Sequence, residues 1–147
     1  MSLRPTSQKN LNTLTPTFRA LIQQLVKCGN DGGFDVQISC GYRSPEVQAT
    51  LYGQGRTKPG KIVTNARPWR SLHQYRIAVD LFFMVDGKAD FTPSNYKKLW
   101  ELACKMGLDK EGLTWSGTWL GKLKETAHFQ LGKPKWQDLY AEHLKTI

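Results

Sequence analysis

The segment that decides the fold is Ser71-Leu72-His73-Gln74-Tyr75-Arg76-Ile77-Ala78-Val79-Asp80-Leu81-Phe82-Phe83-Met84-Val85. From Ile77 onward it is apolar except for Asp80, and this composition predicts a β-strand with most of its side chains buried. The apolar stretch is far shorter than the ~20 residues that a membrane-spanning helix needs. An unpaired carboxylate inside such a strand would cost several kcal/mol in desolvation. Asp80 must therefore have a partner, and either an arginine or a metal ion would serve.

The segments around this strand carry both helical and strand patterns. Amphipathic helices are predicted to begin at Thr15-Pro16 and Thr92-Pro93 and to end at Gly29 and Gly107. Alternating apolar and polar residues predict a half-buried strand from Phe34 to Cys40. The other expected elements are a short helix over 45–51, an exposed basic loop over 53–70, a turn at 86–87, a short strand over 128–131 and a last helix over 134–144. Together they predict an α+β fold with helices packed on a small, mostly antiparallel sheet.

Length and composition indicate one globular domain. The chain has 147 residues, of which 39% are hydrophobic and 22% charged. These values exclude general disorder and leave enough chain for a core and a cleft. Its three cysteines, Cys28, Cys40 and Cys104, include no CxxC pair, so we expect reduced, buried thiols and no thiolate zinc site. The N-terminal residues lack the apolar core of a secretory signal peptide.

The net charge of +9 favours an anionic partner. Nucleic acid, anionic lipid and a negatively charged cell wall would all be attracted to such a surface. The sequence has no aromatic RNA-binding signature, no zinc-finger spacing and no long basic helix. These absences disfavour a nucleic-acid partner, although charge alone does not choose among polyanions.

Two histidines lie at informative positions relative to acidic residues. His73 precedes Asp80 by seven positions, and His128 follows Glu125 by three. Each histidine taken alone could be structural, as we expect for His143 on the last helix. Taken together, two histidines and one aspartate suit zinc with one coordination position left open. A nearby glutamate that is not a ligand is the general base that metal-assisted hydrolysis requires.

The spacing of these residues resembles a known family. Ser71-x-His73-x6-Asp80 followed by Glu125-x-x-His128 is similar to the motifs of the zinc D-Ala-D-Ala carboxypeptidase / L-alanyl-D-glutamate peptidase family, which includes phage endolysins. Further matches between about residues 41 and 130 are Gly41-Tyr42-Arg43-Ser44, Gln48, Leu51, Val63-Thr64-Asn65-Ala66 and His128-Phe129-Gln130. One departure is Arg76, which stands where the family usually has glycine. This departure puts the local loop shape in question, but not the ligands.

The resemblance implies a role for each matching residue. His73, Asp80 and His128 would hold one zinc ion at the sheet. Glu125 would take a proton from the attacking water and return it to the leaving amine. Arg43 would stabilise the oxyanion with its fixed positive charge. Weaker candidates for residues that support the ligands or line the cleft are Ser71, Gln48 and Trp115; for Ser71 and Trp115, simple packing or hydrogen bonding is an equal alternative.

The resemblance further implies a single zinc peptidase domain over residues 1–147, without a separate wall-binding domain. Its substrate would be the stem peptides of bacterial peptidoglycan, cut between L-Ala and D-Glu. A compact, basic chain without a leader fits a bacteriophage endolysin, an antimicrobial hydrolase that degrades the cell wall and causes cytolysis. We therefore expect a monomer made in the host cytoplasm that acts on the wall after release. Its charge would hold it on an anionic wall or outer-membrane surface.

Three alternatives remain at this point. The first is a D-Ala-D-Ala carboxypeptidase, which shares the same motifs. The second is a binding module that contains the metal but does not catalyse; Glu125 argues against it, because such a module needs no base beside the metal. The third is the basic nucleic-acid-binding protein. Removing zinc would abolish wall hydrolysis but leave nucleic-acid binding largely intact.

Overall fold

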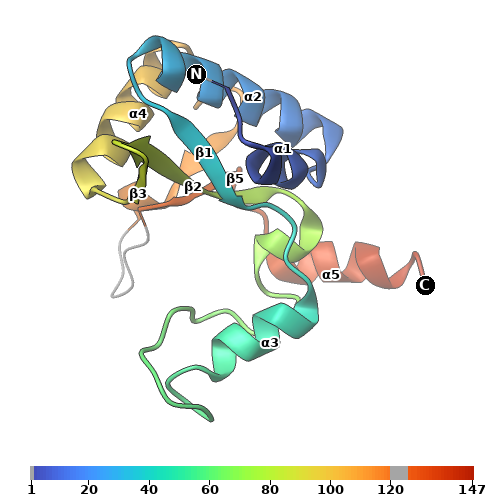
Figure 1. Cartoon of the computed structure of the whole chain (residues 1–147). Helices are drawn as coiled ribbons and strands as arrows, with labels where there is room; N and C mark the ends of the chain where they lie inside the picture. The colour runs from blue at the N-terminus through green and yellow to red at the C-terminus, as the bar shows by residue number, and fades with distance from the viewer. Residues whose placement is uncertain (1, 120–125) are drawn as a thin grey trace.

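The computed structural model describes residues 2–119 and 126–147 (Figure 1). Its helices are α1 (Pro5–Asn12), α2 (Pro16–Asp31), α3 (Pro45–Gly53), α4 (Pro93–Lys105) and α5 (Trp136–Leu144), with short 3-10 turns η1 (Leu72–Tyr75) and η2 (Ser116–Thr118). Its strands are β1 (Val36–Cys40), β2 (Ala78–Val85), β3 (Lys88–Asp90), β4 (Leu113–Trp115) and β5 (His128–Leu131). The α+β fold predicted from the sequence is confirmed.

The sheet is built around β2. Its order is β1-β2-β5-β4, with β3 also paired to β2, and every pairing is antiparallel. In this register Cys40 of β1 lies beside Asp80 of β2, and Asp80 lies beside His128 of β5. The sheet therefore brings together three residues that are far apart in the sequence.

Helices α2 and α4 pack against each other and cover the sheet (Figure 1). Phe18 and Ile22 of α2 and Leu99 of α4 lie on the apolar faces of these amphipathic helices and are buried. The Tyr96 hydroxyl of α4 donates to the Leu81 carbonyl of β2 at 2.6 Å. Helix α2 continues past its predicted end at Gly29. The reason is packing: a Cβ at Gly29 would lie within 3 Å of the Val36 and Leu99 side chains. Close approach of helix and sheet, and not helix termination, requires this glycine.

Helix α1, which the sequence analysis did not predict, covers the outer edge of β1. The Ile38 amide donates to the Ser7 hydroxyl, and the Asn10 amide group donates to the Ile38 carbonyl, both at 2.9 Å. Gln37, expected to be exposed by the alternating pattern, is buried because its side chain bonds to the chain before α1. These contacts satisfy a strand edge that would otherwise be open to pairing.

Helix α3 and the loop that follows it project away from the body of the molecule (Figure 1). The Ser44 hydroxyl caps α3 by accepting from the Val47 amide. Most of the loop over 54–67 is exposed, as predicted from its basic, glycine-containing sequence.

Of the cysteines, which are all free thiols, only Cys28 is buried. Among the described residues, no helix has both the length and the apolar character needed to cross a membrane.

Arg76 ends η1 in the left-handed region, with φ of 65°. A residue with a Cβ atom is strained in this conformation, whereas glycine is not. This difference explains why the family that the motifs resemble usually has glycine at this position. The arginine makes contacts that a glycine could not. Its guanidinium lies 4.1 Å from the centre of the Tyr42 ring and donates to the Thr13 carbonyl at 3.0 Å. These contacts offset the backbone strain.

We expect Arg76→Ala to lower the free energy of unfolding by about 1 kcal/mol, because the cation–π contact and the hydrogen bond are lost while the strain remains. Arg76→Gly loses the same contacts but relieves the strain, so it should be about 1 kcal/mol more stable than the alanine variant. Urea denaturation of the three proteins measures both differences. Equal stability of the two variants would show that the backbone is not strained.

Candidate metal centre

Asp80 contacts its partners through both of its carboxylate oxygens. Its Oδ1 lies 3.4 Å from His73 Nε2 and 3.4 Å from His128 Nδ1. Its Oδ2 accepts a hydrogen bond from Arg43 Nη2 at 3.1 Å. The sequence left two kinds of partner open for Asp80, an arginine or a metal ion. The structure has an arginine on one oxygen and two histidines, which could hold a metal ion, facing the other.

The distances at Oδ1 fit zinc ligation better than direct hydrogen bonding. Good N–H···O bonds are roughly 2.7–3.2 Å long. Ligand atoms at about 2.0–2.2 Å from a tetrahedral zinc lie about 3.3–3.6 Å from one another. The two 3.4 Å separations between Asp80 Oδ1 and the histidine nitrogens fall in this second range. Asp80 Oδ1 thus lies at a ligand-to-ligand distance from the facing nitrogen of each histidine that the sequence motifs imply.

The other nitrogen of each histidine is already used as a donor. His73 Nδ1 donates to the Gly41 carbonyl at 2.8 Å. His128 Nε2 donates to Gln130 Oε1 at 2.9 Å, and Gln130 in turn donates to the Gly132 carbonyl at 2.7 Å. In the neutral form of each ring, these bonds place the lone pair on the nitrogen that faces Asp80. Such supporting bonds fix the ring orientation and tautomer of metal-binding histidines.

The electrostatics of the group favour a bound positive charge. Burial disfavours the charged form of His73, but the Asp80 carboxylate and the contact with Cys40 outweigh it and raise the pKa of His73 to about 10. Burial would also raise the pKa of Asp80, but the facing rings of His73 and His128 outweigh it and hold that pKa well below its usual range. Asp80 is therefore ionised. Its negative charge favours either protonation of the facing histidine rings or binding of a metal cation between them.

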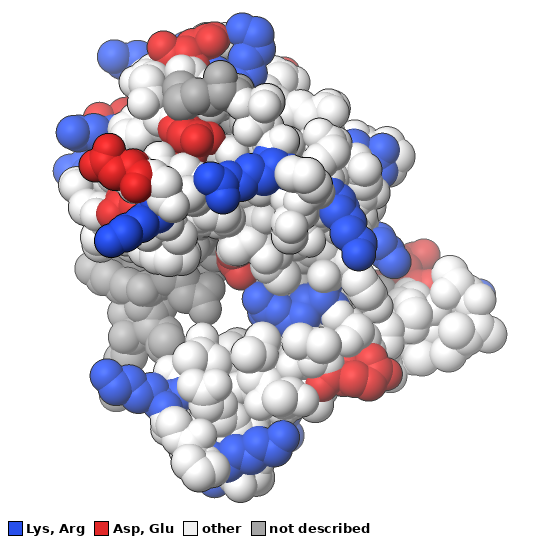
Figure 2. Space-filling model, in the orientation of Figure 1, with Lys and Arg blue, Asp and Glu red and all other residues white. Residues whose placement is uncertain are grey.

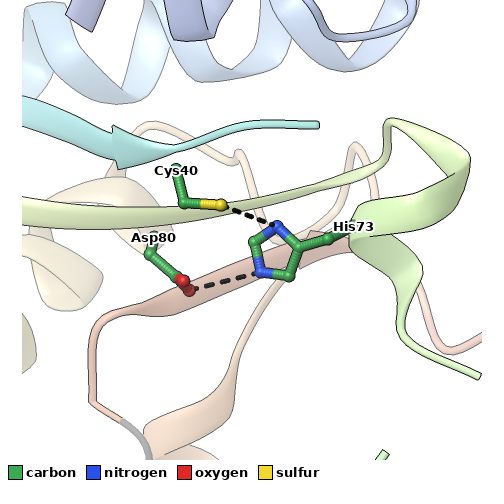
Figure 3. A group of neighbouring side chains, drawn as sticks. All are labelled: Cys40, His73 and Asp80. Carbon is green, nitrogen blue, oxygen red and sulfur yellow. Dashed lines mark hydrogen bonds and ion pairs between the residues drawn. The ribbon is translucent and has the colours of Figure 1, made fainter. Parts of the chain in front are cut away.

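Cys40 is a further candidate ligand, although the cysteine spacing predicted no thiolate zinc site. Cys40, His73 and Asp80 lie close enough together to hold a metal ion (Figure 3). However, the Cys40 Sγ contacts His73 Nδ1 at 3.7 Å, on the side of the ring away from Asp80 (Figure 3). That nitrogen already donates to Gly41. The geometry therefore favours His128 over Cys40 as the third ligand.

Arg43 is held by a network of buried amides. Its Nη1 donates to Gln48 Oε1 at 3.1 Å, and its carbonyl accepts from Gln74 Nε2 at 3.0 Å. The Gln48 side chain is fully buried and donates to the Ala66 carbonyl at 2.8 Å. Gln48 thus links Arg43 to the loop after α3. Gln74, which the sequence analysis missed, lies next to the ligand His73 on the same 3-10 turn.

The metal centre opens into a cleft of about 810 Å³. Figure 2 shows the hollow between the body of the molecule and the part formed by α3 and its loop, with basic side chains around it. Arg43, Ser71 and Trp119 line this cleft together with the ligands. Ser71 also caps η1, since its hydroxyl accepts from the His73 amide. Trp119, whose ring centre lies 5.6 Å from that of His128, was not predicted as a site residue.

One predicted residue, Trp115, lies elsewhere, and another is not described. Trp115 is not among the described residues that line the cleft. It is buried in the core, where it stacks on Phe129 and its indole N–H donates to the Thr126 carbonyl at 2.7 Å. It therefore supports the chain just before His128. Glu125 lies outside the described residues.

Comparison with known proteins gives consistent matches. The VanY family of D-alanyl-D-alanine carboxypeptidases matches residues 11–142, a longer stretch than the 41–130 expected from the motifs. The peptidoglycan L-alanyl-D-glutamate endopeptidase CwlK of Bacillus subtilis (strain 168) is 31% identical over 129 residues, covering 80% of this chain and 73% of the relative.

Solved structures share the fold. The L-Ala D-Glu endopeptidase ChiX of Serratia marcescens superposes with a TM-score of 0.67 at 21% identity, covering 94% of this chain and 93% of ChiX. The vancomycin-resistance D,D-pentapeptidase VanY, determined with Zn(II), gives a TM-score of 0.57 at 18% identity, covering 82% of this chain and 73% of that one. At these identities the structural likeness describes the fold.

The two possible third ligands, His128 and Cys40, lead to opposite predictions for zinc binding. We expect His128→Ala to lose zinc, because it removes a nitrogen that faces Asp80 Oδ1. We expect Cys40→Ala to keep zinc, because its sulfur lies on the other side of the His73 ring. Metal analysis of the dialysed proteins, with wild type as reference, measures both. The reverse result would assign the metal to Cys40, His73 and Asp80.

Proposed function

This chain belongs to the VanY family of D-alanyl-D-alanine carboxypeptidases, and on that premise we propose that it is a zinc-dependent endopeptidase that cleaves the L-alanyl-D-glutamate bond of peptidoglycan stem peptides. The observation that carries the hydrolytic part of this proposal is the arrangement at Asp80. Two histidine nitrogens lie 3.4 Å from one carboxylate oxygen, and both rings are oriented by hydrogen bonds on their far side.

The three ligands, which line the cleft, would hold one zinc ion there. Zinc in such a site activates water for attack and polarises the carbonyl of the scissile bond. Each ligand is fixed from outside: His73 by the Gly41 carbonyl, His128 by Gln130, and Asp80 by Arg43 on its second oxygen. This rigidity keeps the donor atoms in place and reduces the reorganisation needed during the reaction.

Glu125 is our candidate for the proton carrier. It precedes His128 by three residues and falls outside the described part of the chain. A carboxylate in this role takes a proton from the attacking water and gives it to the amine of the leaving D-Glu. A module that only binds would not require it.

Arg43 would contribute a fixed positive charge at the cleft wall. Its guanidinium already donates to Gln48 and Asp80, so its position is set before a substrate arrives. Arginine has five N–H donors, which leaves some of them for the oxyanion that forms on the carbonyl. Arg43 would thus both orient Asp80 and stabilise negative charge in the transition state.

The choice of bond is supported by the relatives. CwlK, at 31% identity, is an L-alanyl-D-glutamate endopeptidase, and the same specificity is stated for ChiX. The second candidate is D,D-carboxypeptidase activity, which the description of the family favours. We further propose that the enzyme degrades the wall in the manner of an endolysin, and that the exposed cations of the loop after α3, including Arg56, Lys58 and Lys61, attract it to the anionic wall surface.

Digestion of purified peptidoglycan decides between the two bonds. We expect new N-terminal D-Glu, detected by amine labelling, together with a fall in turbidity. A chelator should abolish both, because the ligands then have no metal. Release of free D-Ala without new D-Glu amines would establish the carboxypeptidase instead.

Glu125→Gln keeps the shape of the side chain but removes its ability to accept a proton. We expect this variant to bind zinc normally while turnover falls by about 10²–10⁴-fold. Metal analysis and peptide hydrolysis, measured on the same sample, separate the two effects. Wild-type turnover in this variant would exclude Glu125 from the mechanism.

A further inference from the structure

The cleft continues beyond the metal centre into a second hollow of about 400 Å³. Four residues line both spaces: Arg70, Leu72, Trp119 and Gln130. Gln130 also accepts from the ligand His128. The second hollow is therefore one side chain away from the metal centre, which places it within reach of a substrate bound there.

Two cations line this hollow, and each lies near an indole ring. The Arg70 guanidinium lies 4.6 Å from the centre of the Trp136 ring, and Lys133 Nζ lies 6.0 Å from that of Trp119. Such contacts orient a cation without neutralising it. Neither cation forms an ion pair within the described part of the chain, and no described acidic residue lines the hollow. The positive charge is thus available to a ligand.

The segments that carry these cations are fixed to the body of the protein. Trp69, next to Arg70, stacks on His143 of α5 with ring centres 4.2 Å apart. Lys133 follows Gly132, whose amide donates to the Gly112 carbonyl at 2.7 Å. Gly132 has a φ of 64°, which turns the chain between β5 and α5. Both cations therefore extend from anchored backbone.

We propose that this second hollow binds a carboxylate group of the stem peptide, with Arg70 and Lys133 as the residues that recognise it. The inference rests on the proposed peptidase function and specifies its substrate. A guanidinium presents paired N–H donors that match a carboxylate, and an ammonium adds a second charge. Recognition of this kind selects a peptide that carries a free acid close to the bond that is cut.

A stem peptide offers this group from two sources: the α-carboxylate of D-Glu, and the carboxylate of a residue further along. Three peptides distinguish them. The parent is N-acetyl-L-Ala-γ-D-Glu-L-Ala with both carboxylates free. In the second peptide the D-Glu α-carboxylate is a carboxamide, and in the third the terminal carboxylate is a carboxamide. All three retain the L-Ala–D-Glu bond.

For wild type we expect one of the two carboxamides to lower kcat/KM roughly tenfold or more, mainly through KM, as the loss of a charge-assisted contact would. Arg70→Gln and Lys133→Gln should each lower kcat/KM for the parent by a similar factor. For the carboxamide peptide that wild type cleaves poorly, each variant should have the same kcat/KM as wild type, because the contact is already lost. The discriminated carboxamide identifies the source of the bound carboxylate.

Lys135→Gln is the matched control, because it removes the same charge from a residue that does not line the hollow. It should keep the discrimination of wild type, and thermal melting of each variant checks that it folds. Equal kcat/KM of wild type for all three peptides overturns the carboxylate proposal while the endopeptidase function stands. Failure of wild type to cleave any of them, with release of D-Ala from a D-Ala–D-Ala peptide, overturns both.

Discussion

The half-buried carboxylate of Asp80 is the constraint on which the rest of the site depends. It lies in the central strand of the sheet, where an unpaired charge would be strongly destabilising. Its partners come from three separate parts of the chain: Arg43 after β1, His73 on η1 and His128 on β5. Bringing these parts together compensates the charge of Asp80 within the sheet. The same contacts therefore assemble the candidate metal centre.

The two oxygens of Asp80 have separate roles. One is bound by Arg43, a cation that no pH change in the physiological range removes. The other faces the histidines and is open to a metal. Because Arg43 is itself held by Gln48, and Gln48 by the Ala66 carbonyl, the loop after α3 is connected to the candidate metal centre through partly buried hydrogen bonds. The cleft wall and the candidate ligands thus belong to one hydrogen-bonded network.

Sequence patterns predicted the elements that are long and periodic, namely α2, α4 and β2, because burial of one face leaves a clear signal. They missed α1 and β4, which are short and gain their stability from contacts with distant residues. Cys40 was missed as a site residue because it reaches His73 only through the register of β1 against β2. Gln130 was matched as part of His128-Phe129-Gln130 but given no role, although it lies two residues from His128 on one strand and so shares its face.

Arg76 shows why a short motif does not contain everything its function needs. Between His73 and Asp80 the chain leaves η1 and enters β2, and the left-handed residue at position 76 ends η1 at this junction. Glycine would adopt this conformation without support. Arginine requires the ring of Tyr42 and the carbonyl of Thr13, which precede the motif by some 30 and 60 residues in the sequence. A departure within the motif has thus made the geometry of the ligands dependent on the N-terminal part of the fold.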